Sequence, residues 1–402
     1  MDPARLSAGI ACESAQSLIA SVRRSTSVPS TFVSGLDALV EAANCELRRG
    51  DVVEIQGLPA SGKSELMLYL AATALLMRTA HVRVDQRVLE VPVGGKEESV
   101  VWLACAATAR AVDLDRLAGL LRHQIVVAVT RYRAPRGIGA PRDREYDALV
   151  DECLARLLVF SPTSMLQLAV TIRTLPEWAG RNAFEPLGTV LLDGMSELAW
   201  LDQHDLEQKQ ANLGGGVASG AAPTAAPRTK PSDQPPVRLV CAAIAHLRRT
   251  LAPLVFISQW VFRPRAVLSQ LSQDGLPFYA HHYAPPFWPS ITTPQPPPDE
   301  GADPLDSPTL IEGRWPTFPL ALHITLHPRR KPTFRAGTSL EQVRSEVRRV
   351  QAERATALEQ RGVGTAAVPG LGTEGVTCVV RRPGGVEIGS WDMSIFDKEV
   401  VT

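Results

Sequence analysis

The first two thirds of the chain alternate between short apolar runs and longer segments in which apolar residues recur at helical spacing. The apolar runs occupy residues 51–55, 99–105, 157–160, 188–193 and 253–259. The helical segments occupy residues 65–77, 113–123, 163–178 and 237–251. Strands of a parallel sheet are buried on both faces and read as continuous apolar runs, with crossover helices between them. The pattern predicts an α/β fold with a mostly parallel, doubly wound sheet.

Weaker patterns flank this alternation. Short elements are expected at residues 14–23 (helix), 83–93 (hairpin), 320–326 (strand), 376–381 and 386–388 (closing strands). Residues 339–342 read Ser-Leu-Glu-Gln, which has the form of a capping box and opens a charged helix to about Arg361. We expect this helix to pack on its own core; a partner helix is the alternative, because its apolar residues fall at coiled-coil spacing.

Composition separates two insertions from the core. Residues 213–236 are rich in Gly, Ala, Pro, Ser and Thr and predict a disordered segment. Residues 261–316 are rich in proline, aromatic and basic residues. The expected organisation is an N-terminal helix and lead-in (1–45), the core (46–212 and 237–260), the insertions (213–236 and 261–316), and C-terminal strands with the charged helix 339–361 (317–402).

Overall charge and cysteine usage narrow the class of protein. Lys plus Arg and Asp plus Glu both number 42, so no global positive field attracts nucleic acid, and any DNA contact must be local or shared with partners. The six cysteines include no C-x-x-C pair, which argues against a zinc site and favours reduced thiols in an intracellular protein. No apolar run approaches ~20 residues and no secretory segment opens the chain, so we expect a soluble protein.

The strongest local signal is a phosphate-binding loop. Residues 57–64 read Gly57-Leu58-Pro59-Ala60-Ser61-Gly62-Lys63-Ser64, the G-x-x-x-x-G-K-S pattern, between a predicted strand and a predicted helix. The glycines let successive backbone N–H groups point at phosphates, and the helix adds the positive end of its dipole. Lys63 is expected to reach the β- and γ-phosphates of ATP, and Ser64 to ligate Mg²⁺.

A second acidic position fits the same chemistry. The apolar strand at residues 188–193 ends in Asp193, and a carboxylate at a strand end can hold Mg²⁺ through water. Such a junction alone is a weak signal, but together with the phosphate loop it predicts that Asp193 faces Ser64. A chance match of the loop pattern, with no site behind it, is the alternative.

The segments around the loop resemble the RecA-type recombinase family, and in particular its paralogues that lack a helix-hairpin-helix domain. The resemblance is carried by residues 30–39 and 45–51 before the loop, by Gly62-Lys63-Ser64-Glu65-Leu66 in it, and by Leu192-Asp193-Gly194-Met195-Ser196 with Trp200-Leu201-Asp202. It covers roughly residues 12–260. The glutamate directly after the loop serine and the Trp-x-Asp after the acidic strand are its specific parts.

The resemblance implies a RecA-like phosphate-loop NTPase core and a nuclear role in repair of double-strand breaks by homologous recombination. It implies a mediator that binds ATP and Mg²⁺, works with other recombinase paralogues and contacts single-stranded or branched DNA. Gln259 matches the family's sensor of the γ-phosphate. The family's water-activating glutamate has no counterpart at residues 106–110, which read Ala-Ala-Thr-Ala-Arg, so we expect slow hydrolysis or none.

Several functional alternatives stay open. Residues 131–144 form a basic, Gly- and Pro-punctuated segment that favours a solvated surface loop over a contact with a phosphate backbone. Both insertions could contact DNA, although a passive segment is favoured for each. A DNA-stimulated ATPase that forms filaments by itself, a nucleotide-bound scaffold without DNA contact and, more distantly, a small-molecule kinase are the alternative functions.

Overall fold

A computed structural model gives the fold of most of the core. It describes residues 30–45, 47–84, 87–105, 112–181, 187–214, 236–261, 264–265, 278–279, 320–328, 374–382, 387–395 and 400–401, with single positions between 339 and 349. The predicted helix at residues 14–23, most of both insertions and most of the helix at 339–361 lie outside these residues. Ser339 and Gln342 are described, and they exchange the two hydrogen bonds of a capping box.

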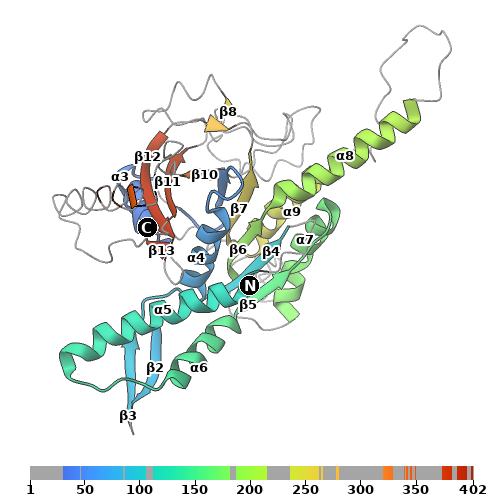
Figure 1. Cartoon of the computed structure of the whole chain (residues 1–402). Coiled ribbons are helices and arrows are strands. Elements are labelled where there is room, and N and C mark those ends of the chain that lie inside the picture. Colours follow the sequence, from blue (N-terminus) through green and yellow to red (C-terminus); the bar gives the residue numbers. More distant parts are fainter. Residues whose placement is uncertain are drawn as a thin grey trace, which may run out of the picture.

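One sheet organises the described residues (Figure 1). Its strands are β1 (Val52–Gly57), β4 (Ser99–Ala104), β5 (Leu157–Phe160), β6 (Leu187–Asp193), β7 (Leu254–Trp260), β10 (Leu320–Pro328), β11 (Glu374–Arg381), β12 (Glu387–Ile395) and β13 (Val400–Val401). They lie in the order β13-β12-β11-β10-β1-β7-β6-β4-β5. Pairing is parallel from β5 through to β10 and antiparallel from β10 to β13.

Helices cover both faces of this sheet. The described helices are α3 (Ser34–Ala42), α4 (Lys63–Leu75), α5 (Leu114–Arg133), α6 (Asp143–Leu154), α7 (Met165–Arg181), α8 (Met195–Gly214) and α9 (Pro236–Thr250). The α4 and α5 side chains form one hydrophobic core with one face of the sheet, and α7, α8 and α9 form a second core with the other face. The predicted α/β fold, a mostly parallel sheet flanked by helices, is confirmed by these pairings and layers.

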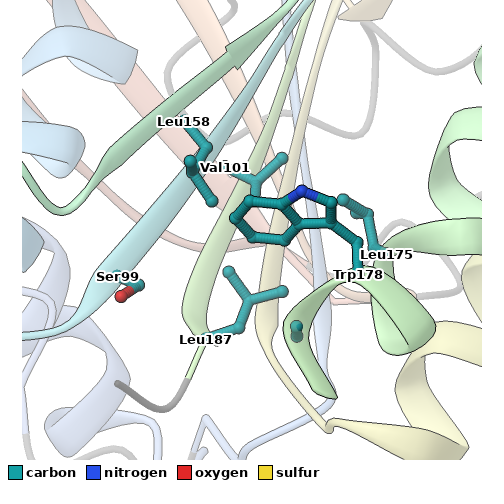
Figure 2. A pocket seen from close by; sticks show the side chains of 7 residues that line it. Ser99, Val101, Leu158, Leu175, Trp178 and Leu187 are labelled. Carbon is teal, nitrogen blue, oxygen red and sulfur yellow. The ribbon is translucent and has the colours of Figure 1, made fainter. Parts of the chain in front are cut away.

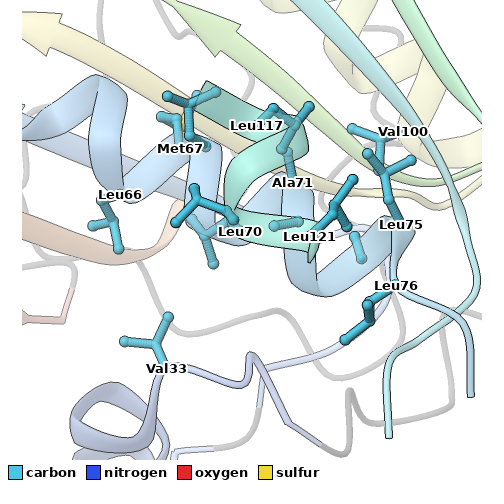
Figure 3. Packing of buried hydrophobic residues seen from close by; sticks show 14 of the residues in the cluster. Val33, Leu66, Met67, Leu70, Ala71, Leu75, Leu76, Val100, Leu117 and Leu121 are labelled. Carbon is cyan, nitrogen blue, oxygen red and sulfur yellow. The ribbon is translucent and has the colours of Figure 1, made fainter. Parts of the chain in front are cut away.

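The larger core is centred on α4. Its residues from Leu66 to Leu75 are almost all buried, and they meet Leu117 and Leu121 of α5 and Val100 of β4 (Figure 3). Val33 of the lead-in packs into the same cluster. A helix that is apolar nearly all round must be covered on every side, so α4 and the loop before it are held rigidly.

A lobe extends from the sheet beside α4. The strands β2 (Thr79–Val84) and β3 (Arg87–Pro92) form an antiparallel hairpin, which packs against α6 and α5 (Figure 1). The sequence predicted this hairpin at residues 83–93, four residues later than it begins. The short helix η1 (Ala134–Arg136) continues α5 toward α6.

Three expectations about this region are corrected. The predicted helix 113–123 is the first half of α5, which runs ten residues further and takes in the start of the supposed basic loop. Residues 124–130 have no predicted element, and residues 131–133 fall in the predicted basic loop because two of them are arginines. Residues 143–154 form α6, whose first two residues fall in the predicted basic loop and whose remainder has no predicted element. Strand β5 was expected to be buried but lies at the sheet edge, where its four residues are half-buried or exposed.

Within the described residues no helix is long and apolar enough to cross a membrane. Of the cysteines described, Cys105, Cys153 and Cys378 are buried, Cys45 and Cys241 are half-buried, and all five are free thiols. The scattered cysteines are therefore packing residues in this part of the chain.

Candidate functional site: the phosphate loop

The phosphate loop has the expected strand, loop and helix context. β1 ends at Gly57 and α4 begins at Lys63. Gly62 caps α4 with a φ of 89°, a left-handed conformation that glycine adopts most easily. A Cβ at Gly57 would lie 2.3 Å from Ser61 Oγ and 2.9 Å from the carbonyl oxygen of Leu326. Both glycines of the motif are therefore required by the backbone.

Lys63 lies inside the curl of the loop. Its ammonium donates to the carbonyl oxygens of Gly57, at 3.0 Å, and Leu58, at 2.8 Å. Lys63 is only 6% exposed, and burial lowers its pKa to about 8, although the carboxylate of Asp193 opposes this shift. An anion inside the loop would offer this ammonium a better partner than neutral carbonyl groups.

Ser64 and Asp193 meet across the end of the sheet. Ser64 Oγ donates to Asp193 Oδ1 at 3.3 Å, although 129 positions separate them in the chain. Asp193 Oδ1 also accepts a 2.6 Å hydrogen bond from Ser258, whose hydroxyl oxygen accepts from the backbone N–H of Gly194 at 2.8 Å. The structure thus brings together the two residues predicted to bind Mg²⁺, and Ser258 orients the aspartate by a hydrogen bond.

Gln259 is placed differently from these two residues. It lies on β7 directly opposite Gln56 of β1, and it is 1% exposed. Its neighbour Ser258, and not Gln259, contacts Asp193. Among the described residues, the side-chain nitrogen of Gln259 has no hydrogen-bond partner. Burial of an N–H group without an acceptor costs free energy. A ligand oxygen that accepted a hydrogen bond from the Gln259 amide would remove this cost.

Ser258 contributes to the site but is not indicated by the sequence. Ser258 was passed over because a serine in a buried strand has no pattern of its own. Ser196, which the sequence places directly after the acidic strand, accepts a hydrogen bond from the backbone N–H of Trp260 at 2.8 Å and so joins the start of α8 to the end of β7.

Two residues that carried the family resemblance have structural contacts. Glu65, directly after the loop serine, accepts hydrogen bonds from Arg116 of α5 at 3.0 and 3.1 Å. Asp202 of the Trp-x-Asp motif accepts from the backbone N–H of Met165 at 3.2 Å, which caps the start of α7. The first contact joins α4 to α5 on one side of the sheet, and the second joins α8 to α7 on the other.

The lead-in segment is also tied to the loop helix. Asp37 accepts hydrogen bonds from the hydroxyls of Ser30, at 2.5 Å, and Thr31, at 2.6 Å, and so closes the turn before α3. The hydroxyl of Tyr69 in α4 donates to the carbonyl oxygen of Phe32 at 3.1 Å. The residues before the loop that carry the family resemblance therefore contact α4.

A buried polar network lies beside the loop strand, on the sheet face opposite α4. Glu54 of β1 and His323 of β10 are 3.1 Å apart, and both side chains are fully buried. The other ring nitrogen of His323 is 3.0 Å from the hydroxyl of Thr325, which also accepts from Arg381 at 3.0 Å. Arg381 pairs with Glu387 of β12. The network therefore links four neighbouring strands, from β1 to β12.

A separate hollow lies at the opposite end of the strands. Figure 2 shows Trp178 of α7 over it. The lining is apolar apart from the hydroxyl of Ser99 and the indole nitrogen of Trp178: Ser99, Val101, Leu158, Leu175, Trp178, Ala179 and Leu187. Ser99 and Leu187 begin their strands, whereas phosphate-loop residues follow the end of β1. This hollow lacks the polar groups that a nucleotide requires.

The residues at the loop fit a nucleotide with Mg²⁺. Among the described residues, no cluster of three or more His, Cys, Asp or Glu could hold a metal alone. Mg²⁺ usually takes one or two protein oxygens and completes its octahedron with water and phosphate. Ser64 and Asp193 offer such a pair of oxygens beside the loop.

Comparisons with known proteins add little to this geometry. No family model matches the chain, and no curated protein matches its sequence. One solved structure that is similar is described as the crystal structure of the RadB recombinase. It shares 11% identity, covers 93% of this chain and 98% of that chain, and gives a TM-score of 0.41. The fold class therefore depends on the strand pairings and the phosphate loop described above.

Proposed function

We propose that the chain is an ATP-binding protein of the RecA-type recombinase class that acts in DNA repair by homologous recombination. The observation that carries the nucleotide part is the meeting of Ser64 and Asp193, 3.3 Å apart, beside a loop that holds Lys63 inside its curl. In this proposal Lys63 binds the β- and γ-phosphates, and Ser64 and Asp193 hold Mg²⁺. The cation would neutralise phosphate charge and orient the triphosphate.

The role within repair is the finer part of the proposal. The lead-in and the motifs after the acidic strand resemble recombinase paralogues, most of all the one called X-ray repair cross-complementing protein two. On that basis the chain is a nuclear mediator that works in a complex of paralogues on single-stranded or branched DNA. Hydrolysis is slow or absent, because residues 106–110, which lie outside the described residues, include no carboxylate.

ATP would then act as a conformational ligand. A γ-phosphate that bonded both Lys63 and the amide of Gln259 would connect the loop to the end of β7. The chain that follows β7 leads into the insertion at residues 261–316. A ligand shifts a conformational equilibrium only by its differential affinity, and these two contacts would supply that difference.

Calorimetric titration of the full chain with ATP, in the presence and absence of Mg²⁺, tests the nucleotide part. Wild-type protein should bind, and Lys63→Ala should lose affinity by at least tenfold because the phosphate loses its buried cation. Asp193→Asn should remove the benefit of Mg²⁺ while binding without metal persists. Equal affinity in wild type and Lys63→Ala, with both folded, would refute the assignment.

A second experiment tests the mediator part. Affinity purification of the tagged chain from cells should recover recombinase paralogues, and the purified complex should bind single-stranded DNA in a salt-sensitive manner. Purification without any paralogue would contradict the complex. Binding of paralogues with no affinity for DNA would favour a scaffold instead.

A further inference from the structure

The lobe beside α4 gathers arginines from separate parts of the chain. We define the tip lobe as β2–β3, the second half of α5, η1 and the start of α6 (Figure 1). Its parts are in contact, because α6 packs against β2 and α5 against β3. A Cβ built at Gly139, in the turn between η1 and α6, would lie 3.9 Å from Val84 at the end of β2. The hairpin end and the turn are therefore neighbours.

Exposed arginines occur on each part of the tip lobe. Arg87 begins β3 directly opposite Val84, Arg131 lies near the end of α5, and Arg142 precedes α6. All three are exposed. Within the part of the chain that the structure describes, none of these side chains forms an ion pair or a hydrogen bond. Their guanidinium groups are available to a ligand.

The acids of the same segment are already matched. Asp143 and Asp147 both pair with Arg122, at 2.9 and 3.6 Å, and Glu145 lies 3.8 Å from Arg144. These are the acids between residues 131 and 147, so the remaining arginines of the segment leave a local positive surplus in a chain with no net charge. On the hairpin, Glu90 lies opposite His81 and on the other face from Arg87. The remaining acid of the hairpin, Asp85, lies between the two strands, outside the described residues.

One further arginine offers a flat surface. The guanidinium of Arg136 lies over the ring of Tyr132, 4.0 Å from its centroid, and donates to the carbonyl oxygen of Tyr132 at 2.7 Å. Arg136 is exposed and Tyr132 is half-buried. A guanidinium held on an aromatic ring keeps its outer face free to stack on a nucleobase.

The tip lobe is distinct from the nucleotide site. The chain leaves the phosphate loop through α4, whose 13 residues span about 20 Å, before β2 begins. The hairpin therefore begins beyond the far end of α4 from the phosphate loop (Figure 1). An anion bound at the tip lobe would not touch the ATP site.

We propose that the tip lobe is a nucleic-acid binding surface, on which Arg87, Arg131 and Arg142 contact backbone phosphates and Arg136 supports a base. Arginine forks match phosphate oxygens in two-point contacts, which favours a repeated phosphate backbone over the isolated carboxylates of a peptide. The choice of DNA as the nucleic acid rests on the proposed function, whereas the surface itself rests on the arginines.

The test is a salt titration of binding by the full chain to a fluorescent single-stranded DNA. The variant Arg87→Gln/Arg131→Gln/Arg142→Gln should bind at least tenfold more weakly at low salt. Its plot of log affinity against log salt should be less steep by about 2, because three phosphate contacts of about 0.7 each are lost. Lysine at the three positions should restore most of the slope.

A matched variant controls for net charge. Arg173→Gln/Arg181→Gln/Arg249→Gln changes the charge by the same amount on α7 and α9, outside the tip lobe. It should leave DNA affinity and slope close to wild type. ATP binding and thermal unfolding should be unchanged in both triple variants, which shows that the fold and the loop are intact.

Three outcomes would overturn the proposal. An equal loss in both triple variants would mean that only net charge matters. Wild-type DNA binding that the tip-lobe variant leaves intact would place DNA elsewhere, without touching the proposed function. Binding of polyglutamate that depends on the tip lobe, with no binding of DNA or RNA, would make it a peptide surface. If the protein binds RNA through the tip lobe but does not bind DNA, the proposal of a nucleic-acid surface is supported and the proposed function in DNA repair is contradicted.

Discussion

Lys63 shows how burial prepares one residue for an anionic ligand. Its ammonium is held in the loop by carbonyl groups, and desolvation lowers its pKa to about 8. Below pH 8 the side chain is charged with or without ligand. Above pH 8 the free protein loses the proton, whereas phosphate binding must restore it.

ATP affinity should therefore be nearly constant up to about pH 7.5 and fall by up to tenfold per pH unit between pH 8 and 9.5. The measurement is calorimetric titration at constant Mg²⁺ across this range. Lys63→Arg supplies the control, because arginine keeps its charge throughout and should remove the decline. A decline of the same steepness in the arginine variant would assign it to another group.

At this scale the sequence was sufficient for residues 57–64 and for Asp193, because each belongs to a local pattern. It was insufficient for Ser258, whose contact with Asp193 joins positions 65 apart, and for the pair Glu54 and His323, which are 269 apart. Such contacts depend on which strands become neighbours, and a single sequence does not encode that in any short window.

Among the elements, β1 and β10 are joined by a buried side-chain pair as well as by their backbone hydrogen bonds. Glu54 and His323 face each other with no exposure, and His323 continues the network to Thr325. Removal of one member of a buried pair leaves the other without its partner, and this costs about 3–5 kcal/mol. Loss of both members costs less than the sum of the single losses.

We therefore expect Glu54→Ala and His323→Ala each to lower the free energy of unfolding by about 3 kcal/mol or more, and the double variant to lose less than their sum. Urea unfolding followed by circular dichroism provides the values. Additive losses would show that the two side chains are stabilised independently. Such a result would remove the network as the link between the loop strand and the C-terminal strands.

Element prediction succeeded where burial on both faces makes a strand continuous in the sequence, as in β4, β6 and β7. The prediction of elements failed where one side of a strand or helix is exposed to solvent. An apolar run such as residues 157–160 does not reveal whether a neighbouring strand lies on each side, and β5 proved to be an edge. The last turn of α5 was assigned to a loop because Arg131 and Arg133 give it the composition of a solvated segment.

At the scale of the molecule, the lead-in helix α3 packs against the C-terminal strand β12. Gly35 of α3 packs directly on Trp391 of β12, and a Cβ at Gly35 would lie 2.4 Å from Trp391 Cγ. Trp391 and Leu36 belong to the same hydrophobic core as α4. Segments more than 350 positions apart therefore support the helix that follows the phosphate loop.

This contact predicts that substitutions at Gly35 and Trp391 have strongly non-additive effects on stability. Gly35→Ala should lower the free energy of unfolding by about 1–3 kcal/mol, because the new methyl group overlaps a buried ring that cannot retreat. Trp391→Ala should cost about 3–5 kcal/mol through the cavity it leaves. In the Trp391→Ala background, however, Gly35→Ala has room and should cost almost nothing. Chemical unfolding of the four proteins gives the coupling, and an equal cost of Gly35→Ala in both backgrounds would mean that α3 does not rest on β12.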